Sequence, residues 1–276
     1  MMKNTSKILF NVLMLLLAVA LYQFASSSSA VKNALTHQTP DLLIIESDTV
    51  GIFSNPLEAI FNNDYQRPDD IFGDDCSTTD CWRGYIGLWE LSRDSLFLTD
   101  ILSCCSEKSL GENELTELTQ GRFQDGRAFA DWVSHKILIP IGERLFYQHM
   151  GYNSVYEKEV HLDFLNGILV NTDTLNNVPT HVASFPDGIE GFQKYVIQNL
   201  RSDFTSDEEL FFIIALKIDK NGTASVDTIY RSENPSLLNE VRKIVSEAPK
   251  WEPAYWKGEL TEDYISISIR SSTKRD

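Results

Sequence analysis

The most regular pattern of hydrophobic and polar positions lies in the last third of the chain, at residues 185–271. It predicts a helix over residues 185–200, with Asp187 as the N-cap and Glu190 as the second member of a capping box. The apolar stripe of this helix recurs at helical spacing and comprises Ile189, Phe192, Val196 and Leu200.

The residues that follow this helix predict a strand hairpin. The segment LFFIIALKI is apolar on both faces over much of its length, which is typical of a buried strand. The turn DKNG follows, and Asn221 with Gly222 supplies the positive φ angles that a tight hairpin needs. ASVDTIYR is then the return strand.

A second helix and a last strand complete the pattern. Asn234 is the predicted N-cap, Pro235 occupies the first helical position, and Pro249 ends the helix. The last strand, DYISISIR, alternates strictly, so that Ser266 and Ser268 face away from the core. The predicted core positions of the two elements are Leu237, Leu238, Val241, Ile244, Val245, Ile265, Ile267 and Ile269.

The segment EAPKWEPAYWKGE joins the second helix to the last strand and is rich in aromatic residues. Trp251 lies between Pro249 and Pro253, which stiffen the path, and we expect it to close the end of the helix–sheet core. Trp256 lies nearer the turn at Gly258, where we expect a half-exposed position.

Residues 48–170 predict a mostly antiparallel β domain of unknown function. Short apolar segments separated by Gly and Asn are typical of a small barrel or sandwich. The predicted strands are TVGIF, WRGYIGLWEL, SLFLTDIL, HKILIPI, KEVHLDFL and GILVN. We expect residues 31–47 to be a tether and the polar residues 171–184 to be a linker. A β domain followed by a domain of helices and strands makes the fold class α+β.

The first thirty residues have the features of an export signal. Lys3 and Lys7 precede an apolar segment at residues 8–25, and Ala30 fits the last position before a cleavage site. The apolar segment is also long enough to remain as an inner-membrane anchor. Both alternatives place the rest of the chain in the periplasm or cell envelope.

The charge balance excludes some partners. The formal net charge is −16 at pH 7, whereas phosphate backbones and anionic membranes are bound by clustered Lys and Arg. We therefore expect no nucleic-acid partner.

Export would permit disulfide bonds among the four cysteines. Cys104 and Cys105 are adjacent, and a bond between neighbours is strained, so crossed pairing with Cys76 and Cys81 is the expected arrangement. Free buried thiols are the alternative. The spacing does not match the paired motifs of zinc sites, and no metal is expected.

No pattern in the sequence predicts an enzyme or a cofactor. The five histidines form no close pair, and Thr228 stands where a calcium loop after Asp219 would need a glutamate. Glu157 and Glu159 are interpreted as a solvated strand edge, and His161 as a residue on the solvent face of a strand. Core packing is predicted for the aromatic residues Trp82, Trp89 and Trp132.

Three segments in the last ninety or so residues carry a resemblance to a known family: FPDGIEGFQKYVIQNL, IIALKIDKNG and NPSLLNEVRKIVSEAPKWEP. Together they resemble the C-terminal domain of TonB, the energy-transducing protein that reaches outer-membrane receptors. The resemblance spans residues 185–271. It implies an αββαβ domain with a three-stranded antiparallel sheet and two helices.

The resemblance also implies a binding mode. In the family the last strand is a sheet edge to which an extended peptide is added. The residues of this chain that take that role are Ile265, Ser266, Ile267, Ser268 and Ile269, with the aromatic Trp256 nearby in sequence. The implied partners are an outer-membrane receptor peptide or another envelope protein, and inner-membrane motor proteins if the chain is anchored.

This chain also departs from the family. RSDFTSDEE replaces a Tyr-Pro pair and a glycine, Thr261 and Asp263 stand where apolar residues are usual, and no Pro-rich spacer is present. The alternative function is therefore a non-transducing structural or glycan- or lipid-binding envelope protein, in which the C-terminal domain mediates protein contacts.

Overall fold

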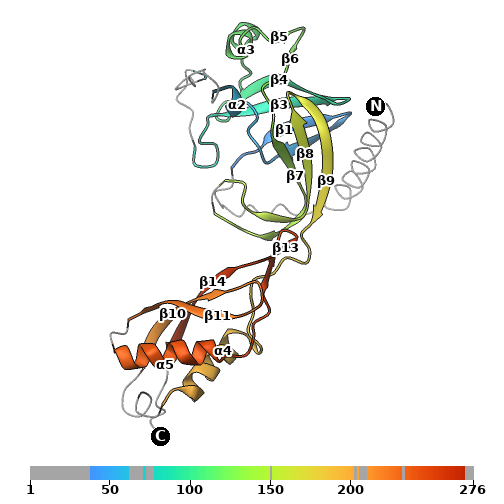
Figure 1. The fold of residues 1–276 in the computed structure, drawn as a ribbon. Helices are drawn as coiled ribbons and strands as arrows, with labels where there is room; N and C mark the ends of the chain where they lie inside the picture. The colour runs from blue at the N-terminus through green and yellow to red at the C-terminus, as the bar shows by residue number, and fades with distance from the viewer. Residues whose placement is uncertain are drawn as a thin grey trace. The chain divides into compact units, whose positions relative to one another are not determined.

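The structure is a computed structural model that describes residues 38–61, 71–72, 78–149, 151–201, 204, 210–231 and 234–270. The chain divides into two compact units, Met1–Val178 and Pro179–Asp276 (Figure 1). The fold is α+β and mostly sheet. The predicted signal peptide or anchor, residues 1–30, lies outside the described residues. Within the described part, no helix has the length and apolar character needed to span a membrane.

Unit 1 is built on one sheet whose strands follow the order β2-β1-β3-β4-β9-β8-β7, with β5 and β6 attached to β4. Neighbouring strands pair in antiparallel fashion, except that β1 and β3 are parallel. The strands are β1 (Asp41–Ile45), β2 (Asp48–Ile52), β3 (Tyr85–Ser92), β4 (Ser95–Ser103), β5 (Phe123–Gln124), β6 (Arg127–Phe129), β7 (Lys136–Phe146), β8 (Val155–Leu165) and β9 (Ile168–Asn176). Two short helices, α2 (Glu58–Phe61) and α3 (Glu112–Leu118), lie in its loops.

The sheet of unit 1 curls around a hydrophobic core. A hydrogen bond joins the two ends of the strand order, β2 and β7. The backbone N–H of Phe53, just after β2, donates to the carbonyl of Leu138 in β7 at 2.7 Å. Alternate residues of each strand face inward, as the two-residue period of a strand requires. Trp89, Leu98 and Ile137 are fully buried members of this core.

Two predicted connecting segments of unit 1 are strands instead. Residues 41–45 of the predicted tether form β1, whose Leu43 and Ile45 are buried in the core. Residues 171–176 of the predicted linker form the second half of β9, which pairs with β8 over its length. Hydrogen bonding to a neighbour maintains this polar strand, and the hydrophobic pattern gave no signal of it.

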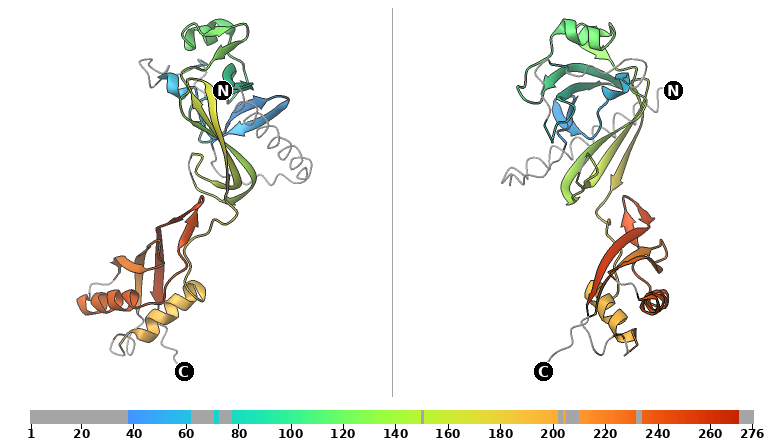
Figure 2. Two further views of the ribbon diagram at one scale, coloured as in Figure 1. Left: turned by 45° about the vertical axis from the view of Figure 1, so that its right-hand side comes forward. Right: turned by 90° about the vertical axis from the view of Figure 1, so that its left-hand side faces the viewer.

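Unit 2 contains helix, strand, strand, helix and a last strand in the predicted order. Its sheet has the strand order β11-β10-β14, and both neighbouring pairs are antiparallel. The elements are α4 (Gly188–Asn199), β10 (Phe211–Ile218), β11 (Ala224–Tyr230), α5 (Pro235–Ser246), β12 (Ala254–Trp256), β13 (Glu259–Thr261) and β14 (Asp263–Arg270). The small β12–β13 hairpin was not predicted. Both helices cover the same face of the sheet (Figures 1 and 2).

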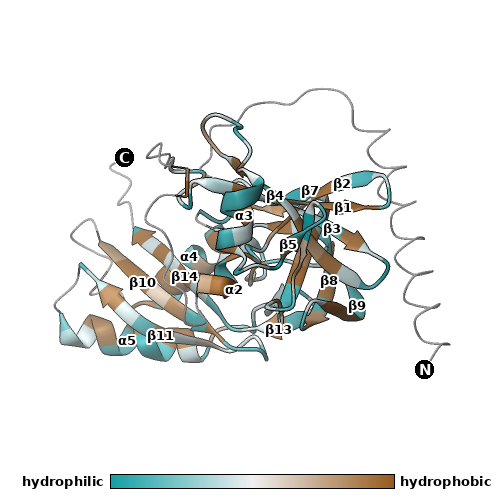
Figure 3. Ribbon diagram, turned by 90° about the horizontal axis from the view of Figure 1, so that it is seen from above, coloured by the Kyte–Doolittle hydropathy of each residue, from teal (hydrophilic) through white to brown (hydrophobic). Residues whose placement is uncertain are grey.

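The core of unit 2 lies between that face and the helices. Phe212 and Ile214 of β10 are fully buried, and β10 is drawn largely in the hydrophobic colour in Figure 3. Trp251 is 2% exposed, and its ring lies 5.2 Å from the rings of both Phe185 and Phe192, measured between centroids. This tryptophan closes the end of the core, as predicted.

The two helices of unit 2 begin differently. Asn234 caps α5 as predicted, because its side chain accepts hydrogen bonds from Ser236 and Leu237. Asp187 is the N-cap residue of α4 as predicted, but the predicted capping box is wrong, because Asp187 has a φ of 64° and its side chain makes no capping bond. A side chain that caps a helix projects from an extended backbone, and the left-handed backbone of Asp187 directs its side chain elsewhere. Ile189, predicted in the buried stripe, is 42% exposed.

Candidate functional site

The predicted partner-binding residues Ile265–Ile269 lie in the middle of β14, at an edge of the sheet of unit 2. Among the described residues β14 pairs only with β10, in a regular register that places Ser266 opposite Ala215. Ile267 and Ile269 are buried under the helices, Ile265 is half-buried, and Ser266 and Ser268 are exposed on the other face. The expected alternation of this strand is therefore confirmed.

Two hydrogen bonds indicate which backbone groups of β14 face away from β10. At the hairpin turn, the N–H of Asp219 donates to the carbonyl of Thr223, so Asp219 is turned toward β11 and Ile218 toward β14. The backbone N–H and carbonyl groups of successive residues point to opposite sides of a strand. The register therefore directs the backbone groups of the β14 isoleucines toward β10 and those of the intervening residues away from β10.

The second hydrogen bond gives the same result independently. The side-chain Nε2 of Gln193, on α4, donates to the carbonyl oxygen of Ser268 at 2.8 Å. A carbonyl turned toward β10 would lie between the two strands, out of reach of a helix side chain. The N–H and carbonyl groups of Tyr264, Ser266 and Ser268 therefore lie along the open edge.

The N–H of Tyr264 also faces the open edge, and it already has a hydrogen-bond partner within the protein. The N–H of Tyr264 donates to the Oδ1 of Asp263 at 2.8 Å, and the Oδ2 of the same carboxylate accepts from the N–H of Ala183 at 2.9 Å. Sequence reasoning identified neither Asp263 nor Gln193 as part of this edge. No local signal could have done so for Gln193, because it reaches β14 from α4, 75 residues away in the sequence.

Trp256, the remaining predicted binding residue, is not in this strand. It is the last residue of β12 and is half-buried, in agreement with the expected exposure. Its neighbour Tyr255 stacks on His181, with ring centroids 6.3 Å apart. The structure thus places Trp256 in the small hairpin that precedes β14 rather than among Ile265–Ile269.

The exposed face of the sheet beside β14 carries aromatic rings and charged groups. The guanidinium groups of Arg231 and Arg270 lie over the ring of Phe211, at 5.4 and 5.2 Å from its centroid. The ammonium of Lys217 lies 2.9 Å from a carboxylate oxygen of Glu262, and the hydrogen bond to Glu262 raises the pKa of Lys217. The two arginines thus pack on the same aromatic ring at the end of β14.

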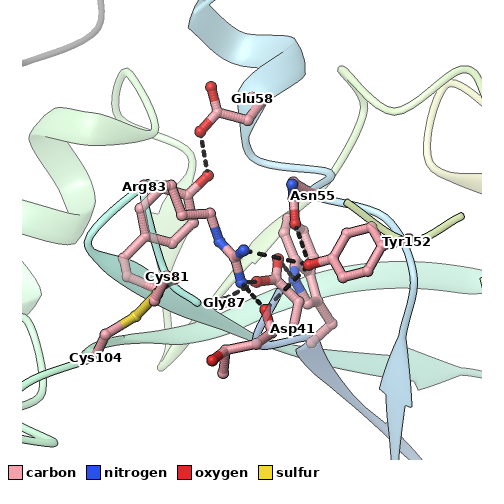
Figure 4. Close-up of polar contacts among 11 residues, drawn as sticks. Asp41, Asn55, Glu58, Cys81, Arg83, Gly87, Cys104 and Tyr152 are labelled. Carbon is pink, nitrogen blue, oxygen red and sulfur yellow. Dashed lines mark hydrogen bonds and ion pairs between the residues drawn. A yellow bond between two sulfur atoms is a disulfide. The ribbon is translucent and has the colours of Figure 1, made fainter. Parts of the chain in front are cut away.

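A buried polar network in unit 1 is the other chemically distinctive site (Figure 4). The carboxylate of Asp41 accepts from Arg83 at 2.8 Å, from the N–H of Gly87 at 3.0 Å and from the indole N–H of Trp89 at 3.1 Å. Arg83 also donates to Tyr152 at 3.2 Å. Burial raises the pKa of Asp41, and Arg83 with the two N–H donors opposes that shift.

The phenol groups of the network are also buried. Burial raises the pKa of Tyr152 to about 12 and that of Tyr85 well above its usual value. Tyr85 donates to a carboxylate oxygen of Glu58 at 2.7 Å. The phenols therefore stay protonated and act as hydrogen-bond donors at neutral pH. We interpret the network as a structural one, since its carboxylate, guanidinium and phenol groups bind one another and backbone carbonyls.

The cysteine prediction is confirmed where the structure describes it. Cys81 and Cys104 form a disulfide with their Cα atoms 6.5 Å apart, so the pairing crosses between the two cysteine groups. Cys105 is disulfide-bonded as well, which rules out the alternative of free thiols for these three residues. Cys76 lies outside the described residues. No group of metal-binding side chains occurs in the described part of the chain.

The acidic pair on β8 is not a solvated edge. Glu159 is 1% exposed, and β8 lies between β7 and β9, with Glu159 opposite Pro140 and Leu175. The local alternation of charged residues could not reveal strands on both sides. His161 lies on the same face of β8 as Glu159. This face is not a solvent face as predicted, because only 15% of the His161 side chain is exposed, and its Nε2 lies 3.5 Å from the Glu159 carboxylate.

The tryptophans of unit 1 have different environments. Trp89 is fully buried and Trp132 packs against the same core, as predicted. Core packing is wrong for Trp82, which is 54% exposed. It precedes β3 in a turn beside Cys81, outside the alternation that buries Trp89. Trp82 and Trp89 therefore do not form a shared aromatic surface on which a ligand could stack, because only Trp82 is exposed.

Comparisons with known proteins give little further information. No family model matches the chain. No curated protein matches it. The solved structure of a DUF5043 family protein from Bacteroides uniformis is similar at 9% sequence identity, with a TM-score of 0.22. The match covers 50% of this chain and 87% of that chain, and at this TM-score the likeness supports no conclusion about function.

Proposed function

We propose that the chain is an exported cell-envelope protein whose unit 2 is a TonB-like domain that binds extended peptides by β-strand addition at β14. The partner is a peptide of an outer-membrane receptor or of another envelope protein. Recognition by main-chain hydrogen bonds requires no cofactor and no catalytic group, so the proposed role is non-enzymatic.

The observation that carries this proposal is the one-sided pairing of β14. Backbone N–H and carbonyl groups along an open strand edge are a template for another strand, because each gains a partner when a guest aligns with it. The exposed serines at 266 and 268 leave room beside the backbone, whereas the buried Ile267 and Ile269 hold the strand to the helices. The open edge is therefore rigidly supported.

Ser266→Pro is the sharpest test of this binding mode. The N–H of Ser266 faces outward, so proline removes a donor from the open edge without breaking the ladder to β10. We expect binding of receptor-derived peptides to weaken by about tenfold or more, since the ring also blocks the approach of a guest. Titration calorimetry measures the effect, and Ser266→Ala, which retains the N–H, is the matched control.

A proline at Ile267 would be a poor test, because that residue is 2% exposed and turned toward β10. Unchanged peptide binding by a folded Ser266→Pro protein would contradict strand addition at β14. Binding activity located in unit 1 would then favour the alternative of a structural or glycan- or lipid-binding envelope protein.

Coupling to the inner membrane is a separate part of the proposal. A chain that retains residues 8–25 and copurifies with motor proteins would act as a transducer. A mature chain that begins at Val31 would bind its partner without direct coupling to the membrane. N-terminal sequencing of the mature protein, combined with cell fractionation, distinguishes the two.

A further inference from the structure

We infer that a guest strand at β14 carries apolar side chains on the side that faces the helices, and that Ile189 of α4 is the residue that selects them. The inference rests on the proposed function and names the class of peptide that the open edge accepts. Extended segments without apolar side chains at alternate positions are then poor partners.

Helix α4 reaches the outer side of the edge strand. The side-chain Nε2 of Gln193 donates to the carbonyl of Ser268, a group that faces away from β10. Ile189 and Ile197 lie four residues before and after Gln193, so the three side chains share one face of α4. This face of the helix therefore flanks the space that an added strand would enter.

Two contacts give the direction of α4 along β14. The N–H of Ala183, a few residues before the helix, donates to Asp263 at the start of β14, whereas Gln193 contacts Ser268 near its end. The helix thus advances in the same direction as the strand. Four helical residues rise about 6 Å and two strand residues span about 6.6 Å, so Ile189 lies about level with Ser266.

The isoleucines at this level are incompletely buried. Ile189 is 42% exposed, and Ile265 of β14 is half-buried. Ile267 and Ile269, farther along the strand, are buried. A guest strand would lie about 4.8 Å farther from β10 than β14 does, and every second side chain would point toward the helices. Those side chains would cover Ile189 and remove apolar surface from water.

The alternation of β14 decides which guest residues face the helices. Residues directly opposite one another in paired strands have their side chains on the same face of the sheet. Guest residues opposite Ile265 and Ile267 would therefore face α4 and meet Ile189. Guest residues opposite Ser266 and Ser268 would lie on the other face, beside exposed serines. The fitting guest is an extended segment with aliphatic residues at every second position and polar residues between them.

Two peptides that differ only in the polarity of the alternate side chains test the inference. The full-length protein is titrated with labelled, capped peptides of about seven residues, in which Ser alternates with either Val or Thr. Val and Thr are both β-branched, so the change replaces a methyl group by a hydroxyl without loss of stiffness. By fluorescence anisotropy, the wild type should bind the Ser–Val peptide about tenfold more tightly than the Ser–Thr peptide.

Ile189→Gln should remove most of this preference. Glutamine retains helix propensity but lacks the branched aliphatic group, so affinity for the Ser–Val peptide should fall about fivefold. Affinity for the Ser–Thr peptide should change by less than about twofold. Tyr230→Gln is the matched control and should keep the wild-type preference, because Tyr230 is 52% exposed on β11, at the opposite edge of the same sheet.

Equal affinities of the two peptides for the wild type would overturn the inference, and so would an equal loss of both in Ile189→Gln. In either case, sensitivity of binding to Ser266→Pro would leave the proposed strand addition in place. If neither peptide binds the wild type, the proposed function fails and the inference fails with it.

Discussion

Asp41 shows at the residue scale how unit 1 accommodates a charge in its core. Every second residue from Arg83 to Trp89, in β3 and just before it, lies on the same side of the chain. The carboxylate of Asp41, in β1, accepts hydrogen bonds from Arg83, Gly87 and Trp89. Gly87 permits this approach, because a Cβ there would lie 2.6 Å from Trp89 Nε1 and 2.8 Å from Asp41 Oδ2. A buried carboxylate is tolerated only when it is paired and hydrogen-bonded in this way.

Arg83→Met should therefore destabilise unit 1 strongly. Both side chains of the Arg83–Asp41 pair are fully buried, and loss of one partner leaves an uncompensated charge, at about 3–5 kcal/mol. Lys136→Met is the control, because the Lys136–Asp163 pair is exposed and contributes about 0–1 kcal/mol. Denaturant unfolding measures both.

The deficit of Arg83→Met should also depend on pH. Burial raises the pKa of Asp41, and removal of the guanidinium removes an opposing effect. The folded state then holds a proton that the unfolded state releases, so the variant regains stability as the pH falls. A deficit as small as that of Lys136→Met would contradict the role assigned to the pair.

The DKNG turn shows at the element scale how two distant segments of unit 2 meet. Gly222 has a φ of 77°, and its carbonyl accepts from the N–H of Trp251 at 2.9 Å. The hairpin between β10 and β11 thus holds the segment that carries Trp251 into the core. The positive φ falls on Gly222 alone, although the sequence predicted it for Asn221 as well.

Gly222→Ala should destabilise unit 2 by more than backbone strain alone. A Cβ at this position would overlap the carbonyl of Trp251, in addition to the strain of about 1–2 kcal/mol that a side chain meets at positive φ. Gly188→Ala is the matched control, since Gly188 has a φ of 69° and no atom within 4 Å of such a Cβ. Thermal unfolding compares them, and equal losses would argue against the contact with Trp251.

Two separate hydrophobic cores define the protein at the scale of the whole molecule. The core of unit 1 is enclosed by its curled sheet, and that of unit 2 lies between a three-stranded sheet and two helices. Each unit holds its own buried residues, as an independently stable domain requires.

Core substitutions should therefore act on one unit at a time. Leu98→Ala in unit 1 and Ile214→Ala in unit 2 each truncate a fully buried side chain, which removes about 2–5 kcal/mol from the unit concerned. Calorimetry should show two transitions, and each variant should lower only one. A single transition that both variants lower equally would mean that the units unfold together.

The sequence predicted much of unit 2 and less of unit 1. Asn234, Trp251 and the alternation of β14 follow from local chemistry, so a single sequence reveals them. The burial of Glu159 and the parallel pairing of β1 with β3 depend on strands that are distant in sequence. Periodicity reports which face of a segment is apolar, and it does not report which segments become neighbours.

The candidate site divides in the same way. The sequence by itself determined that residues 263–270 form a strand with isoleucines on one face and serines on the other, because the two-residue period is a local property. Only the tertiary structure decided that this strand lies at an edge and that Gln193 and Asp263 hydrogen-bond backbone groups along it. Hydrogen bonds across a sheet and from a helix to a strand depend on three-dimensional proximity, which the local order of residues does not encode.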